Sequence, residues 1–137
     1  MTKLSDTKQL TLEGARAMGE AAIAEAVKNG WGVAVAVVDA GGHPLYLARM
    51  ENSPVASYRG ASSKAWTAAT FARPTRLLDE GVAAGRTQLL AFGEALPIQG
   101  GLPVQLDGAT IGGIGVGGAT ASEDEQCAQA GIDAVGL

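Results

Sequence analysis

The sequence predicts an α+β domain with an antiparallel sheet and with helices packed mainly on one face of that sheet. Short apolar segments occur in pairs joined by tight turns, which is typical of β-hairpins. Longer segments with apolar residues at helical spacing precede, separate and follow these pairs. The chain has 137 residues, the size of one domain, so residues 1–137 are expected to form a single unit.

The first predicted elements are a helix and a hairpin. The helix begins after Thr11, whose hydroxyl can cap it, and ends near Asn29, where Asn29-Gly30 supplies a stop signal. Residues 31–39 alternate valines with small residues, which indicates a central strand. A tight turn at residues 40–43 then leads into a returning strand at 44–50.

The middle of the chain is predicted to be helical. Residues 57–72 form an alanine-rich helix that ends before Pro74, and residues 75–80 form a short second helix. Residues 86–97 show no clear period, so the sequence assigns them no definite element, although a strand there is one option.

A second hairpin and a last helix complete the prediction. Strands at 104–106 and 109–116 flank Asp107-Gly108, the strongest short hairpin signal in the chain. The last helix runs to about Ala134 and is expected to begin at Ser122, because S-E-D-E at 122–125 fits a capping box.

Composition excludes several functional classes. Ten basic and 14 acidic residues give a net charge of −4, which argues against nucleic-acid binding. One cysteine and one histidine exclude an internal disulfide and a multi-histidine metal site within one subunit. The first thirty residues carry no targeting signal, and the longest apolar run, 33–38, is far below the ~20 residues of a membrane span. The expected location is the cytoplasm, with no membrane partner.

Glycines mark the last predicted strand. Gly113, Gly115 and Gly118 fit G-x-G-x-x-G, but the segment follows a hairpin late in the chain, which is the wrong context for dinucleotide binding. The glycines either admit close backbone packing or leave the backbone open to a flat ligand or a neighbouring subunit.

A few side chains stand out as candidates for chemistry. His43 is either an exposed turn residue or a metal or haem ligand. Lys64 falls on an apolar helical stripe, so it either extends to solvent or points into a pocket. Asp124 and Glu125 suit the first turn of the last helix. Cys127 is expected to be buried and inert, since no cationic residue adjoins it.

Several segments, in order, resemble the haem-binding GlcG/HbpS family, which includes the C-terminal domain of PduO-type proteins. The similarity extends from about residue 10 to residue 135. It is carried by V-V-D-A-G-G-H-P-L (37–45), R-M-E-N-S-P (49–54), S-K-A-W-T-A-A-T-F-A-R-P-T (63–75), G-G-L-P-V (100–104), I-G-G-I-G-V-G-G-A (111–119) and D-E-Q-C-A-Q-A-G (124–131).

The resemblance implies a profilin-like α-β-α domain with a five-stranded antiparallel sheet. It also implies homo-oligomers, often octamers, and binding of haem or a related tetrapyrrole. If haem is bound, either its iron ligand comes from His43, Tyr58, Met50 or Cys127, or the iron is only weakly ligated. The positions expected near the family's pocket are Arg49, Lys64, Thr67, Phe71, Gly100, Gly101, Gly115, Gly117, Asp124 and Glu125.

Two functional hypotheses follow. In the first, the chain is an oligomeric cytoplasmic carrier or sensor for haem, with Lys64 and Arg49 facing the acidic substituents of the ligand. In the second, it is a small cofactor-independent enzyme for a compact carboxylated or aromatic metabolite. Arg49 would then hold the carboxylate, and Lys64 or the Asp124/Glu125 pair would act as acid or base.

Overall fold

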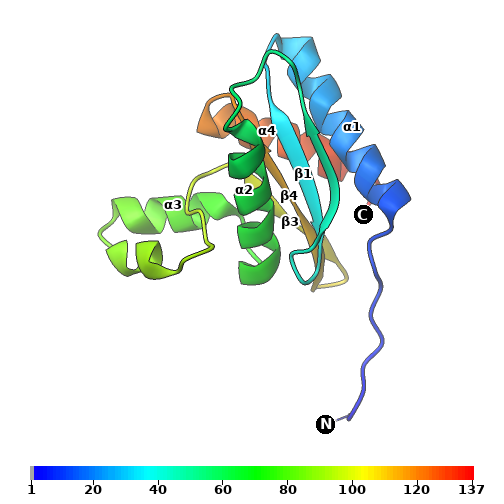
Figure 1. The fold of residues 1–137 in the computed structure, drawn as a ribbon. Coiled ribbons are helices and arrows are strands. Elements are labelled where there is room, and N and C mark those ends of the chain that lie inside the picture. The colour runs from blue at the N-terminus through cyan, green and yellow to red at the C-terminus, as the bar shows by residue number, and fades with distance from the viewer. Residues whose placement is uncertain (1) are drawn as a thin grey trace.

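A four-stranded antiparallel sheet lies between helices in the computed structural model, which describes residues 2–137 (Figure 1). The strand order is β2-β1-β4-β3. The strands are β1 (Ala34–Asp39), β2 (Pro44–Arg49), β3 (Gly101–Leu106) and β4 (Ala109–Gly117). The helices are α1 (Leu12–Asn29), α2 (Ser57–Phe71), α3 (Thr75–Ala83), η1 (Thr87–Ala91, a 3₁₀ helix) and α4 (Ala121–Asp133).

Helices cover both faces of the sheet, so the expectation that they pack mainly on one face is wrong. The reason lies in the alternating side chains of β1. Val35 and Val37 of β1, and Val33 just before it, face the core beneath α1 and α4. The intervening small residues, Ala34 and Ala36, face α2 on the opposite side. The three-layer α-β-α architecture implied by the family resemblance is therefore present.

The sheet has four strands and not five. Residues 86–97, where the sequence left a strand as an option, form η1 and a series of turns. Gly85 adopts a φ of +104°, and the N–H of Arg86 donates to the carbonyl of Gly81, so the chain turns back toward α3. Together, α3 and η1 form an arm that extends away from the sheet (Figure 1).

The capping residues at the helix N-termini agree with the sequence for α1 and differ from it for α4. Thr11 caps α1 by accepting a hydrogen bond from the Gly14 N–H at 3.0 Å, as predicted. The predicted capping box of α4 is wrong by two residues, because Thr120 and Glu123 form it instead of Ser122 and Glu125. Asp124 is consequently placed in the first turn of α4, pointing inward.

The glycines of β4 allow α2 to lie directly on the sheet. A Cβ atom at Gly115 would overlap the backbone of α2 at Ala61 and Ala65. A Cβ atom at Gly117 would lie 2.9 Å from the carbonyl oxygen of Ser57. These glycines therefore serve close backbone packing, the first of the two alternatives raised by the sequence.

No helix among residues 2–137 has both the length and the apolar character that crossing a membrane requires.

Candidate functional site

Lys64 and Asp124 form an ion pair in the interior. Lys64 lies on α2 and Asp124 on α4, and their residues are 5% and 2% exposed. The Nζ atom of Lys64 lies 3.0 Å from Oδ2 of Asp124 and also donates to the carbonyl of Val116 at 3.0 Å. Lys64 thus points inward, toward the end of β4, and does not extend to solvent.

Burial controls the acidity of Asp124. Loss of solvent raises the pKa of its carboxyl above the ordinary value of 3.8. The Lys64 ammonium and the N–H of Ala119, which donates to Oδ1 at 3.0 Å, act in the opposite direction without overcoming burial. The acid or base role that the enzyme hypothesis gives to Lys64, Asp124 and Glu125 stays a prediction.

A cavity of about 300 Å³ adjoins this ion pair. Its walls come from the N-terminus of α2, the end of β4, the start of α4 and the chain after η1. Ser57, Lys64 and Asp124 provide its polar side chains. The other lining residues are Pro54, Ala56, Gly60, Leu96, Ile98, Gly117, Gly118, Ala119 and Ala121.

Gly100 and Glu125, two further predicted site residues, lie near the ion pair but have different surroundings. Gly100 has a φ of +134°, and a Cβ atom there would lie 2.8 Å from Nζ of Lys64. Glu125 points toward the loop before β3, where it accepts from Nε2 of Gln99 at 3.2 Å and lies 3.6 Å from Nε of Arg76. Glu125 is not among the residues that line the cavity.

Thr67, Phe71 and Gly101 make structural contacts. The hydroxyl of Thr67 is buried and accepts from the N–H of Leu96 at 2.9 Å, which fixes one wall of the cavity. Phe71 packs edge-on against Phe92 with ring centroids 5.0 Å apart, so it anchors the arm. Gly101 donates its N–H to the hydroxyl of Thr75. Ligand binding by these three residues stays a prediction.

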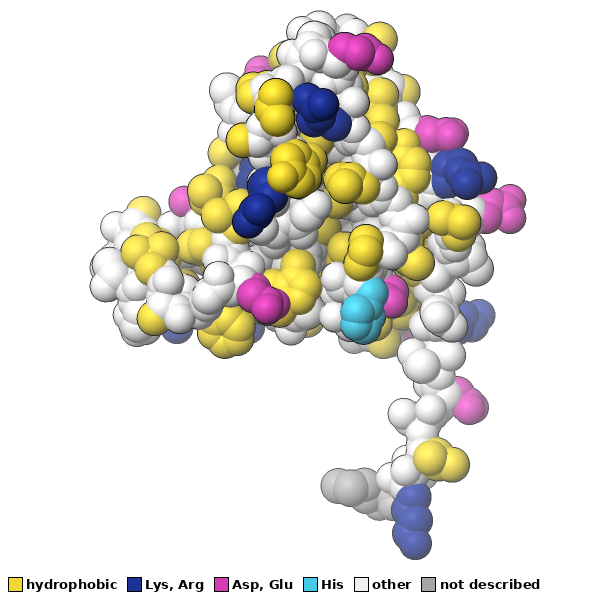
Figure 2. All heavy atoms as spheres, viewed as in Figure 1, with side chains coloured by type: hydrophobic (Ala, Val, Ile, Leu, Met, Phe, Trp, Pro, Cys, Tyr) yellow, Lys and Arg dark blue, Asp and Glu magenta, His cyan; other side chains and the backbone are white. Residues whose placement is uncertain are grey.

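A larger groove of about 560 Å³ lies between α2 and the edge strand β2. Tyr58 and Trp66 line it from α2, and Leu47 lines it from β2. Leu47 is 51% exposed and Tyr58 is 39% exposed, so apolar surface lies open to solvent here. Figure 2 looks onto this face and shows hydrophobic side chains gathered over α2 and β2, with basic side chains beside them.

Two arginines flank this groove. Arg59 on α2 belongs to its lining. Arg49 lies two residues beyond Leu47 on β2, and both pair with residues of β1 that face α2, so Arg49 shares the groove's face of the sheet. Within residues 2–137 neither arginine takes part in a salt bridge. Both are exposed and can meet an anionic group of a ligand.

His43 lies between Gly42 and Pro44, two lining residues of the groove, and its side chain is 77% exposed. Its Nδ1 atom lies 3.1 Å from Oδ1 of Asp39. The backbone N–H of His43 is the main cause that lowers the pKa of Asp39, assisted by the Gly41 N–H and by the imidazole. Asp39 therefore stays ionised and orients the imidazole ring.

The other possible iron ligands are placed differently. Cys127 is fully buried, as predicted, and burial raises the pKa of its thiol to about 12, so it is expected to be unreactive. The Sδ atom of Met50 accepts a hydrogen bond from the N–H of Val33 at 3.5 Å. Of the four candidates, Tyr58 lines the groove, and His43 follows and precedes lining residues without lining it itself. In the described part of the chain, no three His, Cys, Asp or Glu side chains gather as a metal site.

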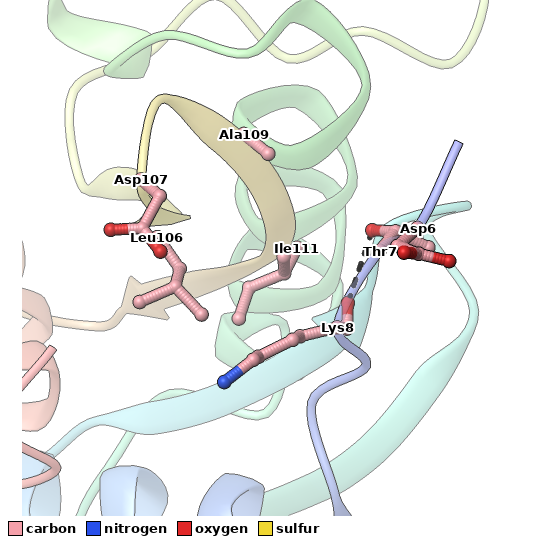
Figure 3. Close-up of a pocket in the computed structure, with 7 residues that line it drawn as sticks. All are labelled: Asp6, Thr7, Lys8, Leu106, Asp107, Ala109 and Ile111. Carbon is pink, nitrogen blue, oxygen red and sulfur yellow. Dashed lines mark hydrogen bonds between the residues drawn. The ribbon is translucent and has the colours of Figure 1, made fainter. Parts of the chain in front are cut away.

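A third cavity, of about 530 Å³, lies between the N-terminal segment and the β3–β4 hairpin (Figure 3). Asp6 and Lys8 come from the N-terminal segment, and Leu106 and Ile111 come from the hairpin. Its charged side chains are exposed, so solvent meets their hydrogen-bonding needs and we assign no function to it.

Comparison with known proteins identifies the family. Residues 10–133 match the family described as "Haem degrading protein HbpS-like". The chain belongs to the HbpS-like family. A curated relative is Protein GlcG of Escherichia coli K12, which is 44% identical over 93 residues that cover 67% of this chain and 69% of that protein.

Solved structures of HbpS-like proteins share the fold. A double mutant of HbpS from Streptomyces reticuli superposes with a TM-score of 0.91 at 39% identity and covers 98% of this chain and 92% of that one. A crystal structure of a PduOC:haem complex superposes with a TM-score of 0.85 at 29% identity and covers 94% of this chain and 96% of that one. The relation to PduO-type proteins expected from the sequence is confirmed.

Sequence reasoning missed Trp66 and Gly60 as lining residues. Tyr58, Ser62 and Trp66 recur every four residues on α2, on the flank beside the alanines that face the sheet. This second, more polar stripe is the signal that could have predicted a groove beside α2. Gly60 carried no comparable signal, because a lone glycine in a helix has many explanations.

Proposed function

We propose that this protein binds haem or a related tetrapyrrole in the groove between α2 and β2. The observation that carries the proposal is one open apolar groove with aromatic walls, flanking arginines and the chain's single histidine at its margin. The volume of about 560 Å³ falls within the usual range of small-molecule sites. A structural relative at 29% identity was solved with haem, which supports the same ligand class.

The residues present fit such a ligand. His43 would hold the iron through Nε2, because Nδ1 faces Asp39, and a carboxylate partner is common for a ligating imidazole. Arg49 and Arg59 would pair with the two propionate groups. Tyr58 and Trp66 would contact the flat ring. Bound haem would supply a redox-active iron, and the protein would set its exposure and orientation.

The proposal includes a cytoplasmic homo-oligomer. The arm of α3 and η1, with Phe92 directly after it, exposes large apolar side chains: Leu77, Leu90 and Phe92 are 45%, 61% and 54% exposed. Exposed apolar surface of this kind is typical of subunit interfaces. An oligomer would bring the grooves of several chains into one particle.

The test is a haemin titration of the purified protein, followed by the Soret absorption band. We expect saturation near one haem per chain, or per pair of chains. The double variant R49A/R59A should bind haemin roughly tenfold or more weakly, because it loses two charge-assisted contacts. R76A is the matched control, since Arg76 lies on α3 and pairs with Glu80. A response that does not saturate would contradict haem binding.

A further inference from the structure

We infer that the turn between β1 and β2 holds His43 ready to bind ferric haem in preference to ferrous haem, with Asp39 and Gly41 as its positioning residues. This selection between two oxidation states of the iron rests on the proposed haem function and adds to it. The His43 side chain is exposed, yet contacts to its ring and its backbone hold it in place. An exposed side chain held in this way is organised before a ligand arrives.

Asp39 closes the turn around His43. Its backbone N–H donates to the carbonyl of His43 at 2.9 Å. Its Oδ1 atom accepts from the backbone N–H groups of Gly41 and His43, each at 2.9 Å. Charge-assisted hydrogen bonds from two neighbouring N–H groups leave a carboxylate few other orientations. The Asp39 carboxylate therefore has a fixed position relative to the backbone of His43.

The same carboxylate determines which ring nitrogen of His43 carries the proton. Nδ1 lies 3.1 Å from Oδ1 and 3.3 Å from Oδ2 of Asp39. The oxygens of an ionised carboxylate only accept hydrogen bonds, so Nδ1 carries the proton of the neutral ring. Nε2 then has the free lone pair, and a neutral imidazole with one free nitrogen is the form that binds a metal ion.

Gly41 leaves room for the imidazole ring. A Cβ atom at Gly41 would lie 2.7 Å from Cε1 and 2.9 Å from Nδ1 of His43, so the ring lies directly against the Gly41 backbone. The backbone itself does not require glycine at this position, because the φ of Gly41 is not positive. A side chain at position 41 would therefore displace the ring of His43 and leave the turn itself unstrained.

Trp66 joins the turn to the wall of the groove. Gly42 has a φ of +84°, and a Cβ atom there would lie 2.5 Å from Cδ1 and 2.8 Å from Nε1 of Trp66. Gly42 and Trp66 both line the groove, so the residue just before His43 packs against an aromatic wall of the groove. The backbone of His43 is thus held beside the groove from two sides, by Asp39 and by α2.

The charge of Asp39 is the reason for the selection of ferric haem. A carboxylate that accepts from Nδ1 makes the imidazole a stronger electron donor, and its negative charge also attracts a cation bound at Nε2. Ferric iron carries one more positive charge than ferrous iron, so both effects favour the ferric form. Among residues 2–137, Asp39 has no salt bridge with a lysine or arginine that would offset its charge.

The first experiment needs no haem, because the ring signals of a single histidine need no assignment. Long-range ¹H–¹⁵N NMR spectra of the labelled protein in alkaline solution show which nitrogen carries the proton of the neutral ring. We expect Nδ1–H in the wild type, whereas unconstrained histidine favours Nε2–H. In G41A the displaced ring should shift toward Nε2–H. A wild-type ring with its proton mainly on Nε2 would overturn the inference.

The second experiment compares the Kd for haemin with the Kd for haem kept ferrous under anaerobic reduction. In D39N an amide oxygen can still accept from the N–H groups of Gly41 and His43, but the charge is gone. We expect the ratio of the ferrous Kd to the ferric Kd to fall about tenfold in D39N, the lower end of the usual effect, because the Asp39 side chain is 26% exposed.

G81A is the matched control for both experiments. Gly81 lies on α3, and a Cβ atom there would make only an ordinary contact, at 3.5 Å, with Leu89. Its ring tautomer and its Kd ratio should be those of the wild type. Saturable haemin binding with the same ratio in the wild type and in D39N would overturn the selection of ferric haem and leave the haem function standing. A wild-type protein that does not bind haemin would overturn both.

Discussion

The Nζ atom of Lys64 lies 3.0 Å from Oδ2 of Asp124, and these two side chains join α2 to α4 across the end of the sheet. Sixty residues separate the pair along the chain. Both are almost completely removed from solvent, so each depends on the other to balance its charge.

Replacement of Lys64 by methionine should destabilise the protein by about 3–5 kcal/mol, because Asp124 would keep a buried charge without a partner. Urea unfolding at neutral pH measures the loss. The double variant K64M/D124L should recover most of the stability, since two apolar side chains need no charge balance. A loss below about 1 kcal/mol in K64M would contradict the described pairing.

The raised pKa of Asp124 should be visible in the pH dependence of stability. The pKa of Asp124 is raised above 3.8 in the folded chain. At pH values between 3.8 and the raised pKa, the folded chain therefore binds a proton that the unfolded chain has released. Asp124 therefore lowers the free energy of unfolding as pH rises through this interval. Urea unfolding of the wild type and of D124N between about pH 3 and 7 isolates the effect. The wild type should lose stability relative to D124N with rising pH, and a relative gain would show that the pKa is lowered.

Cys127 should resist thiol reagents in the folded protein. Its thiol is fully buried, and its pKa of about 12 leaves almost no thiolate at pH 8. Labelling with a chromogenic disulfide should be complete within minutes in strong urea and far slower without it. Rapid labelling of the native protein would mean that α4 opens readily.

Gly115 and Gly60 should respond in opposite ways to alanine. G115A places a methyl group against the backbone of α2 at Ala61 and Ala65 and should cost at least about 1–3 kcal/mol. G60A has open space for its methyl group and should stabilise α2 by about 0.5–1 kcal/mol. Thermal unfolding compares the two. Equal stability of G115A and the wild type would mean that β4 does not closely adjoin α2.

Local signals predicted most of the fold. Thr11 and Gly30 bound α1 as expected, and Asp107-Gly108 forms the predicted turn between β3 and β4. The cap of α4 could not be predicted in the same way, because T-A-S-E at 120–123 and S-E-D-E at 122–125 both fit a capping box. Inward contacts of Asp124 with Ala119 and Lys64 accompany the first choice, and these depend on the tertiary structure.

The candidate sites were less predictable than the fold. The position of Lys64 on an apolar helical stripe predicted that it could point into a pocket. Nothing in the sequence pairs it with Asp124 rather than with another acidic residue. The groove depends on how far α2 leaves β2 uncovered, which is a property of packing. Arg49 could be placed on its face only once the register between β1 and β2 was known.

The most direct test of haem binding is the absorption spectrum of haemin-loaded wild type, H43A and Y58F. Tyr58 lines the groove and His43 adjoins its lining, so the two variants show which of these side chains binds the iron. We expect a sharp Soret band in the wild type and in Y58F, and its loss or marked shift in H43A. An unchanged Soret band in H43A would contradict ligation by His43, and a featureless wild-type spectrum would contradict haem binding itself.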